Sequence, residues 1–301
     1  MKKLSKLLFI TLAFIFILSS CKKKEIEKNE ESVNSYNIDE KIKVSLNSYS
    51  SILSGFKLAE DISLDSKEKS IEKIKNDEVD FTFTSLDEAI KINEENPHIK
   101  IASIGSCDNL YALSKDSFDN IKDFDGKTIY FPGINENFKE KIDDKLKTLS
   151  LFLSIESINL KSNEEVFDKS KEDGVLFILE EPYVELSKDL KVFMSIKDLY
   201  TNLLKKDDFS YINEVLLVND ENLSKDKIEK ERKKINPSDM TGAYVIIKKK
   251  YKMTDQEIEN SLENINFVKE KSADMKDLIK ENAGILYGYD NLSDNLFYIS
   301  N

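Results

Sequence analysis

The sequence predicts an α/β fold in which short apolar strands alternate with helices, and three observations carry this prediction. First, the stretch 99–133 contains three apolar strands, at 99–104, 110–113 and 128–131, joined by turn residues. Second, the five consecutive apolar residues at 175–179 suit a strand that is covered on both faces. Third, such strands alternate with amphipathic helical patterns along most of the chain. We expect the strand at 110–113 to cross between two strand–helix blocks, with a ligand cleft beside the crossing.

Composition narrows the class of protein. The chain has 301 residues, enough for one large or two ordinary domains, and a formal net charge of -12 at pH 7. An acidic surface argues against nucleic acid as a partner. The two cysteines, Cys21 and Cys107, offer no disulfide framework, and the single histidine, His98, leaves no basis for a His-built metal or catalytic site. We expect no metal, no cofactor and no nucleic-acid partner.

The amino terminus has the pattern of an export signal. Three lysines among the first six residues precede an apolar run at 7–18, and Leu-Ser-Ser-Cys follows at 18–21. This run is shorter than the ~20 residues that span a bilayer, which disfavours the alternative of an uncleaved anchor. The tetrapeptide is similar to the lipobox of bacterial lipoproteins. The resemblance implies cleavage of a signal peptide at 1–20 and attachment of palmitate-type acyl chains to Cys21, which would anchor the protein to the membrane.

A polar segment follows the predicted lipidation site. Residues 22–40 read KKKEIEKNEESVNSYNIDE, with few apolar residues and no periodicity, which predicts a disordered tether at 21–40. The lysines at 22–24 either contact anionic lipid headgroups or form an ordinary solvated charge run. We expect the chain to be lipid-anchored at the extracytoplasmic face of the cell membrane.

Before the crossing, alternating apolar residues predict strands and helical periodicity predicts helices. We expect strands at 42–46, 62–64, 79–85 and 99–104, and helical patterns at 52–58, 66–77 and 86–90. Ser85 and Glu88 have the spacing of a capping box at the start of the last helix. The linking segment 105–109 begins with Gly105, which gives the backbone freedom near a ligand. Cys107 in this segment is expected to be a small buried hydrophobe, because neither a histidine nor a second cysteine supports a reactive thiol.

After the crossing, the same reasoning predicts a second block and a helical end. Asn135 can cap a helix that extends to 149 and points its amino terminus at the cleft, and Pro182 suits the first position of another helix. A capping box at Thr254 and Glu257 opens a later helix, and Gly284 is expected to close the last one. We expect strands at 158–160, 175–179, 192–194 and 213–219, and helices at 164–173, 223–235, 237–251 and 272–281, the helices after residue 219 packing on the first lobe.

Four segments carry a family resemblance. They are IKDFDGKTIYFPG at 121–133, GVLFILEEPY at 174–183, NEVLLVN at 213–219 and AGILYGYDNLSDNLFYIS at 283–300. Together with the strand order, they make residues 40–300 resemble the substrate-binding proteins of ABC importers. The most similar branch is the nitrate, sulfonate, taurine and thiamine-pyrimidine-precursor group, whose members are SsuA- and ThiY-like.

The resemblance implies the type II periplasmic binding protein fold. That fold has two α/β lobes, each a mixed sheet flanked by helices, joined by two hinge crossings, and the strand at 213–219 resembles the second crossing. We expect residues 36–108 and 219–301 to form lobe I and residues 109–218 to form lobe II. The implied function is that of a monomeric solute-binding lipoprotein that delivers a small-molecule solute to an ABC permease and ATPase.

Two other functions remain open on the same fold. One is a surface lipoprotein with a sensory or adhesive role. The other is an enzyme of pyrimidine-precursor synthesis or of a menaquinone pathway, although the export signal, the single histidine and the unsupported Cys107 argue against an enzyme.

The candidate binding residues follow predicted strands or lie next to a crossing, where open α/β sheets bind ligands. They are Asn47, Ser48, Tyr49, Thr84, Ser85, Ser106, Asn109, Asn135, Glu181 and Tyr183. Ser48 and Glu181 also suit helix caps, and Tyr111 suits either the cleft or the core. The tyrosines favour a small flat or partly aromatic solute. Because the only arginine, Arg232, lies outside these loops, a hard anion would need helix amino termini and hydroxyl groups.

Overall fold

A computed structural model of the chain describes residues 41–118, 123, 125–149, 154, 156–170, 175–204, 209–235, 240–267 and 272–298. The predicted signal peptide, lipidation at Cys21 and tether concern residues 1–40 and lie outside the described residues. No helix in the described part of the chain combines the length and the apolar character that crossing a membrane requires.

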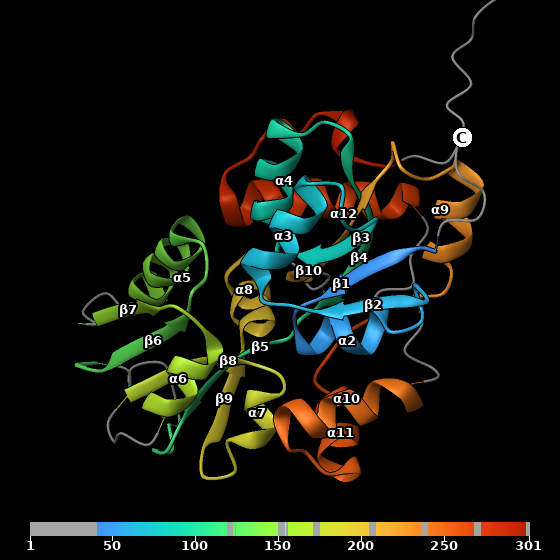
Figure 1. Cartoon of the computed structure of the whole chain (residues 1–301). Helices are drawn as coiled ribbons and strands as arrows, with labels where there is room; N and C mark the ends of the chain where they lie inside the picture. Colours follow the sequence, from blue (N-terminus) through green and yellow to red (C-terminus); the bar gives the residue numbers. More distant parts are fainter. Residues whose placement is uncertain are drawn as a thin grey trace, which may run out of the picture. The chain divides into compact units, whose positions relative to one another are not determined.

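Two five-stranded mixed sheets form the framework of the fold (Figure 1). The first sheet has the spatial order β2 (Asp61–Leu64), β1 (Lys43–Leu46), β3 (Phe81–Thr84), β10 (Ile212–Asn219) and β4 (Ile99–Cys107). The second has the order β7 (Glu156–Leu160), β6 (Thr128–Pro132), β8 (Val175–Glu180), β5 (Leu110–Ser114) and β9 (Lys191–Ser195). In each sheet, one strand runs antiparallel to both of its neighbours: β10 in the first and β5 in the second. The predicted architecture of two mixed sheets is confirmed.

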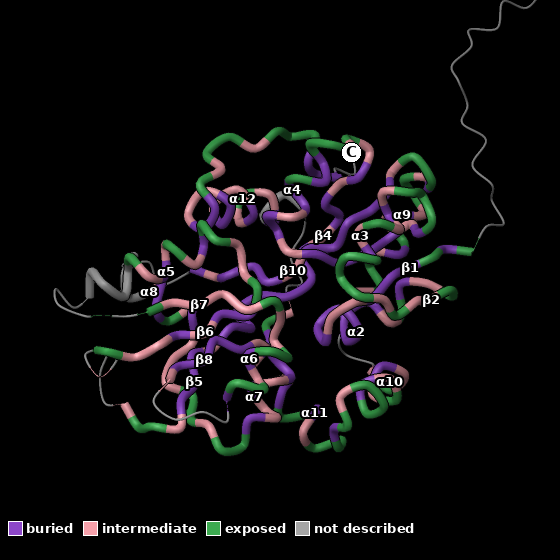
Figure 2. The backbone as a smooth tube through the Cα atoms, turned by 60° about the vertical axis from the view of Figure 1, so that its left-hand side comes forward, coloured by how far each residue is buried: buried purple, intermediate pink, exposed green. Residues whose placement is uncertain are grey.

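Helices cover both faces of the first sheet (Figures 1 and 2). Along β10, Leu216 and Val218 belong to one apolar core, and Val215 and Leu217 belong to another. The first core includes residues of α2 (Tyr49–Gly55), α9 (Lys225–Arg232), α10 (Thr241–Tyr251) and α11 (Asp255–Leu262). The second includes residues of α3 (Lys67–Lys75), α4 (Leu86–Glu95), α12 (Ser272–Asn282), the π-helical turn η2 (Ala283–Tyr287) and the short 3-10 helix η3 (Asp294–Leu296). The helices that follow β10 therefore pack on the first sheet.

The second sheet is also covered on both faces. Leu176 and Ile178 of β8 pack with α5 (Glu136–Leu149) and α8 (Ile196–Leu204), whereas Phe177 and Leu179 face α6 (Asn163–Lys169) and α7 (Tyr183–Leu186). This alternation explains why the apolar run in β8 is uninterrupted. Helix α8 was not among the elements expected from the sequence.

The return from the second sheet to the first occurs earlier in the chain than predicted. The sequence assigned residues 109–218 to lobe II, with the strand at 213–219 as the crossing. Instead, β10 lies between β3 and β4 in the first sheet, with Val215 paired to Thr84. Both faces of β10 are apolar, and a central strand with helices on both sides buries both faces. The return crossing therefore precedes Ile212.

The outward crossing is shorter than predicted. Strand β4 continues to Cys107, whose N–H donates to the carbonyl of Asn266 at 2.7 Å and whose carbonyl accepts from the N–H of Asn266 at 3.1 Å. The link between the sheets consequently contains only Asp108 and Asn109. Ser106 is a strand residue, not the loop residue that the sequence predicted.

Three predicted helix signals are also corrected. Ser85 precedes α4 but makes no capping hydrogen bond with its side chain, so the Ser85–Glu88 box is not formed, unlike the box of Thr254 and Glu257. Pro182 is the N-cap of α7, one position before the predicted site. Gly284 does not end the last helix, because the backbone continues through η2 to Gly288, whose φ of 79° suits glycine.

Candidate ligand-binding cleft

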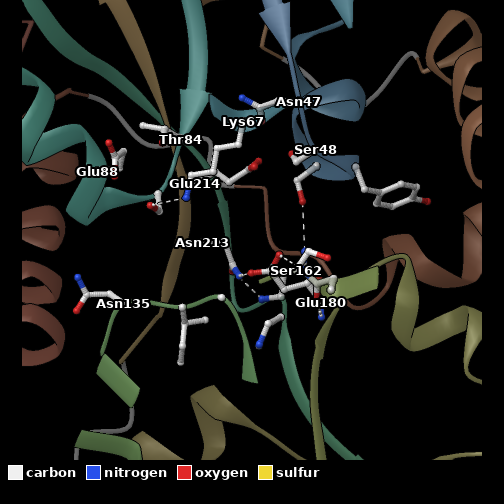
Figure 3. Close-up of a pocket in the computed structure, with 18 of the residues that line it drawn as sticks. Asn47, Ser48, Lys67, Thr84, Glu88, Asn135, Ser162, Glu180, Asn213 and Glu214 are labelled. Atoms are coloured by element: carbon white, nitrogen blue, oxygen red, sulfur yellow. Dashed lines mark hydrogen bonds between the residues drawn. The ribbon is translucent and has the colours of Figure 1, made fainter. Parts of the chain in front are cut away.

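A cavity of about 840 Å³ lies between the two sheets. Its walls come from the segments that follow β1 and β3, from the start of α3, and from the facing ends of β6, β7 and β8. In Figure 3, Ser48, Lys67 and Thr84 lie on one side of the cavity, and Asn135, Ser162 and Glu180 lie on the other. Both lobes thus contribute polar side chains to one cavity, at the edge where α/β sheets bind ligands.

Nine of the ten candidate residues line this cavity: Asn47, Ser48, Tyr49, Thr84, Ser85, Asn109, Asn135, Glu181 and Tyr183. The exception is Ser106, which is fully buried within β4 beside Glu214. Tyr111, which suited either the cleft or the core, does not line the cavity, and its hydroxyl donates to the carbonyl of Asn264 at 2.8 Å. Cys107 is buried within the apolar core, as the sequence predicted.

Asn109 joins the two lobes at the floor of the cavity. Its side-chain Nδ2 donates to Ser50 Oγ of α2 at 3.2 Å, and its Oδ1 accepts from the N–H of Glu181 at 2.8 Å. Its own N–H donates to Asn213 Oδ1 at 2.8 Å. Only 1% of Asn109 is exposed, so these bonds fix the geometry of the floor.

Asp108 ties the two crossings together. Its N–H donates to the carbonyl of Tyr211 at 2.8 Å, and its Oδ1 accepts from the N–H of Tyr211 at 2.9 Å. Its Oδ2 accepts from Ser210 Oγ at 3.1 Å and from Lys197 Nζ at 3.0 Å. Its φ of 60° lies in the left-handed region, which aspartate tolerates better than most residues. The outward and return crossings are therefore held together as one unit beside the cavity.

Three amide and hydroxyl candidates are engaged by the protein itself. Ser48 caps α2 by accepting from the N–H of Ser51 at 2.9 Å. Asn47 Nδ2 donates to the carbonyl of Phe83 at 2.8 Å. Asn135 caps α5 and, through Nδ2, donates to Asp87 Oδ2 at 2.9 Å, which joins the two walls. The predicted cap by Asn135 is confirmed, and Ser48 fulfils its capping alternative.

Glu181 holds the wall near α7. Its Oε2 accepts from the N–H of Glu185 at 3.1 Å, and its Oε1 accepts from Asn264 Nδ2. Only 3% of Glu181 is exposed, and burial raises its pKa to about 7. Glu181 therefore caps a helix, bridges to the segment after α11 and lines the cavity at once. Next to it, the hydroxyl of Tyr183 donates to Glu164.

A second set of carboxyl and amide groups on the floor was not predicted from the sequence. Glu180 Oε1 accepts from Asn213 Nδ2 at 3.4 Å (Figure 3). Its Oε2 accepts from Asn163 Nδ2 at 3.2 Å. Glu214, in β10, completes this set. Burial raises the pKa of Glu180, and it raises the pKa of Glu214 to about 7 against the lowering effects of Ser48 and Lys67. The sequence feature that could have revealed these residues is the polar pair Asn213–Glu214 beside the apolar run of β10.

Two polar atoms on the cavity floor lack a partner. Thr84 Oγ1 and Glu214 Oε2 are buried and have no hydrogen-bond partner among the described residues. Thr84 itself is only 2% exposed. Their strands are adjacent, since Thr84 pairs with Val215, the neighbour of Glu214. A buried polar atom without a partner costs about 1–3 kcal/mol, so this corner of the cavity is ready to accept a polar group.

An aromatic wall closes one side. The ring of Tyr251, from α10, lies 5.5 Å from that of Tyr49 and 6.2 Å from that of Tyr183, both in edge-to-face geometry. Tyr251 was also missed, because it comes from a helix and not from a loop after a strand. Elsewhere, the cavity is bounded by Phe138, which stacks on Tyr211 at 4.9 Å. The cavity thus combines a charged floor with flat apolar surfaces.

The described residues contain no group of three or more His, Cys, Asp or Glu side chains arranged to hold a metal ion.

No protein-family model matches the chain, and no curated protein sequence matches it.

Several solved structures share the fold. An ABC transporter from Parabacteroides distasonis is 14% identical, with a TM-score of 0.63 over 86% of this chain and 99% of that one. The ligand-binding component of an ABC-type import system from Staphylococcus aureus, with zinc bound, is 12% identical, with a TM-score of 0.61 over 85% and 95% of the two chains. The periplasmic aliphatic sulphonate binding protein SsuA from Escherichia coli is 11% identical, with a TM-score of 0.55 over 82% and 86%. The predicted resemblance is confirmed as a likeness of fold: the chain has the two-lobed fold of substrate-binding proteins.

Proposed function

We propose that the chain is a solute-binding lipoprotein that captures a small organic solute outside the cytoplasm and delivers it to an ABC permease and ATPase. The observation that carries the proposal is the cavity between the two sheets, to which both lobes contribute polar side chains next to paired crossings. Solute-binding proteins need such an arrangement, because a ligand that contacts both lobes favours their closed state. The protein acts by binding and not as an enzyme.

The fold supports this role, since the similar structures include ligand-binding components of import systems. The sequence supports the anchor through the apolar run at 7–18 and the Leu-Ser-Ser-Cys box that ends at Cys21. A lipid anchor would keep the protein beside the transporter at the extracytoplasmic face of the membrane.

Native mass spectrometry tests the binding role. The full-length chain is purified in detergent without refolding, and its mass is compared before and after denaturation. We expect a solute that leaves on denaturation, or one that binds after dialysis of the protein against rich growth medium. If no small molecule is retained under either condition, the proposed function is wrong.

Substitution of the predicted lipidation site tests the anchor. The Cys21→Ser variant should move from the membrane pellet to the soluble fraction, because it has no sulfur to carry the acyl chains. Retention of the variant in the pellet, with residues 1–20 uncleaved, would show that this segment is a membrane anchor. Cys107→Ser is the matched control, since it alters a buried thiol of the folded core and should leave localisation unchanged.

A further inference from the structure

The charge of the cavity wall is strongly unbalanced. Nine carboxylate side chains and four lysines line the cavity. Some of the carboxylates are neutralised by the protein, as in Asp65, which pairs with Lys69 and Lys73 at 3.0 and 2.5 Å. Glu180, Glu181 and Glu214, by contrast, form no salt bridge with any described residue. Three carboxyl groups that form no salt bridge with a described residue thus line the cavity.

The lysines of the wall do not cancel this excess. Lys91 pairs with Asp87 at 3.4 Å. Lys67, the lysine that acts on Glu180 and Glu214, is exposed and donates to Ser85 Oγ at 3.2 Å. An anion placed on the floor would meet three carboxyl groups with one exposed ammonium nearby. Because no arginine lines the cavity, there is also no guanidinium to bind a sulfonate or carboxylate in a bidentate manner.

A second, independent observation points to a bound donor. Thr84 and Glu214 lie on adjacent strands and line the cavity, and Thr84 Oγ1 and Glu214 Oε2 have no hydrogen-bond partner within the described part of the chain. In its ionised form, the carboxylate of Glu214 accepts hydrogen bonds and does not donate, so the group that satisfies it in that form carries an N–H or O–H. A protonated nitrogen supplies both this donor and the missing positive charge.

The aromatic wall fits the rest of such a solute. Tyr251 already has a cation beside it, since Lys250 Nζ lies 5.2 Å from the centre of its ring. The rings of Tyr49, Tyr183 and Tyr251 offer an apolar surface whose negative faces also attract cations. An aliphatic or flat body attached to a charged nitrogen would therefore contact the tyrosines while its nitrogen reached the carboxyl floor.

We propose that the solute is an organic cation with a protonated nitrogen, an amine or amidine, which donates to Glu214 and Thr84 on the floor of the cavity. This inference rests on the proposed solute-binding function. It separates this chain from proteins of the same fold whose solutes are sulfonates, because this cavity has more carboxyl groups than lysines and no arginine.

A competition among solute classes tests the inference. The full-length chain in detergent is dialysed against rich growth medium supplemented with equal amounts of phenethylamine, phenethyl alcohol, phenylethanesulfonate, agmatine and zinc chloride. Retained solutes are released by denaturation and identified by mass spectrometry. Glu214→Gln removes one floor carboxylate, and Thr84→Val removes the unpartnered hydroxyl without breaking an existing hydrogen bond. Glu78→Gln, at an exposed carboxylate outside the cavity, is the matched control.

We expect an amine or amidine to be the enriched species, with retention reduced at least about tenfold in Glu214→Gln and several-fold in Thr84→Val, and unchanged in Glu78→Gln. If Glu214→Gln does not fold, Thr84→Val alone decides the role of the floor. Retention of a sulfonate, a neutral solute or zinc alone would overturn the inference and leave the solute-binding function in place. Retention of nothing would contradict the proposed function as well.

The pH dependence of retention gives a further readout. Glu214 faces Glu180 on β8 and Lys67 on α3, and Glu181 faces Glu185 and Asn264. A cation binds the ionised carboxylates, so its affinity should rise between about pH 6 and about pH 8, where these groups lose their protons. Affinity that falls over this range would instead indicate an anionic solute and overturn the inference.

Discussion

At the scale of single residues, ionisation of Glu214 lowers the stability of the unliganded protein, although the proposed cationic solute binds the ionised form. Burial raises the pKa of Glu214 from 4.5 to about 7, so the unliganded protein holds this proton more tightly than the unfolded chain does. Its contribution to stability is therefore complete below about pH 4.5 and is lost as the pH rises through about 7. The loss amounts to about 3 kcal/mol at most, because each pKa unit corresponds to about 1.4 kcal/mol.

The raised pKa of Glu214 determines the direction of the first predicted effect. Glu214→Gln should raise the unfolding free energy of the unliganded protein at about pH 8, and should change it little at about pH 5, where the wild-type carboxyl is protonated. Urea unfolding of both proteins at the two pH values measures the difference. An equal change at both pH values would show that the substitution acts through packing and not through ionisation.

Acidification tests the carboxyl groups whose pKa is lowered, and not raised, in the folded protein. Lys188 and Thr254 lower the pKa of Glu257 to about 2, and Lys73 helps to hold the pKa of Asp65 below its usual value despite burial. Stability from these groups is present above about pH 4.5 and is lost as the pH falls through their folded pKa values. The unliganded protein should therefore be most stable near pH 5, between the two effects.

At the scale of elements, Asp108 couples the two crossings through a left-handed backbone position and the hydrogen bonds that its carboxylate accepts from Tyr211, Ser210 and Lys197. Asp108→Ala would leave the N–H of Tyr211 without its side-chain acceptor and would place a β-carbon without compensating hydrogen bonds at a φ of 60°. We expect a loss of about 2–4 kcal/mol in unfolding free energy from these two effects together.

Two variants separate the causes. Asp108→Gly tolerates the backbone conformation but lacks the carboxylate, and Asp108→Asn retains one acceptor oxygen. Chemical unfolding should rank the Ala variant lowest and the Asn variant closest to the wild type. If the Gly variant matched the wild type, the hydrogen bonds to Ser210 and Tyr211 would contribute nothing and only backbone conformation would matter.

At the scale of the whole molecule, contacts bridge the lobes on both sides of the cavity. On one side, Asn264 donates to Glu181, and Asn260 donates to Glu185 at 3.1 Å. On the other, Lys141 Nζ of α5 donates to the carbonyls of Gly284 and Ile285 in η2 at 3.3 and 2.6 Å. These bridges hold the lobes around the cavity, so they should govern how long a solute stays bound.

Lys141→Met tests this link. The variant keeps the apolar stem and removes the donor to η2, so we expect faster solute release with a smaller change in the association rate. Lys139→Met is the matched control, because Lys139 lies on the same helix and pairs with Glu136 within it. Stopped-flow release of the solute identified by mass spectrometry compares the two variants. Equal release rates would show that the bridge to η2 does not restrain opening.

The sequence could predict most strands, because their apolar runs are set by burial on two faces, as at 175–179. It could also predict cavity residues such as Asn47 and Thr84, since the end of a strand determines where they lie. It could not predict the position of β10, because β10 pairs with strands that lie far away along the chain, and the local hydrophobic pattern does not specify such pairings. Tyr251 and Glu214 were missed for the same reason: helix packing and strand order bring them to the cavity.

The central position of β10 also determines the order in which the first sheet can be completed. Strands β3 and β4 are neighbours in the chain, yet β10 separates them, and among the described strands β4 pairs with β10 alone. During synthesis or export, every strand of the second sheet emerges before Ile212 does, so that sheet has all its partners first. Until β10 arrives, β3 and β4 each present an open edge to other chains. Assembly of the first sheet thus waits until more than two-thirds of the polypeptide has emerged, and chaperone protection would matter most during that interval.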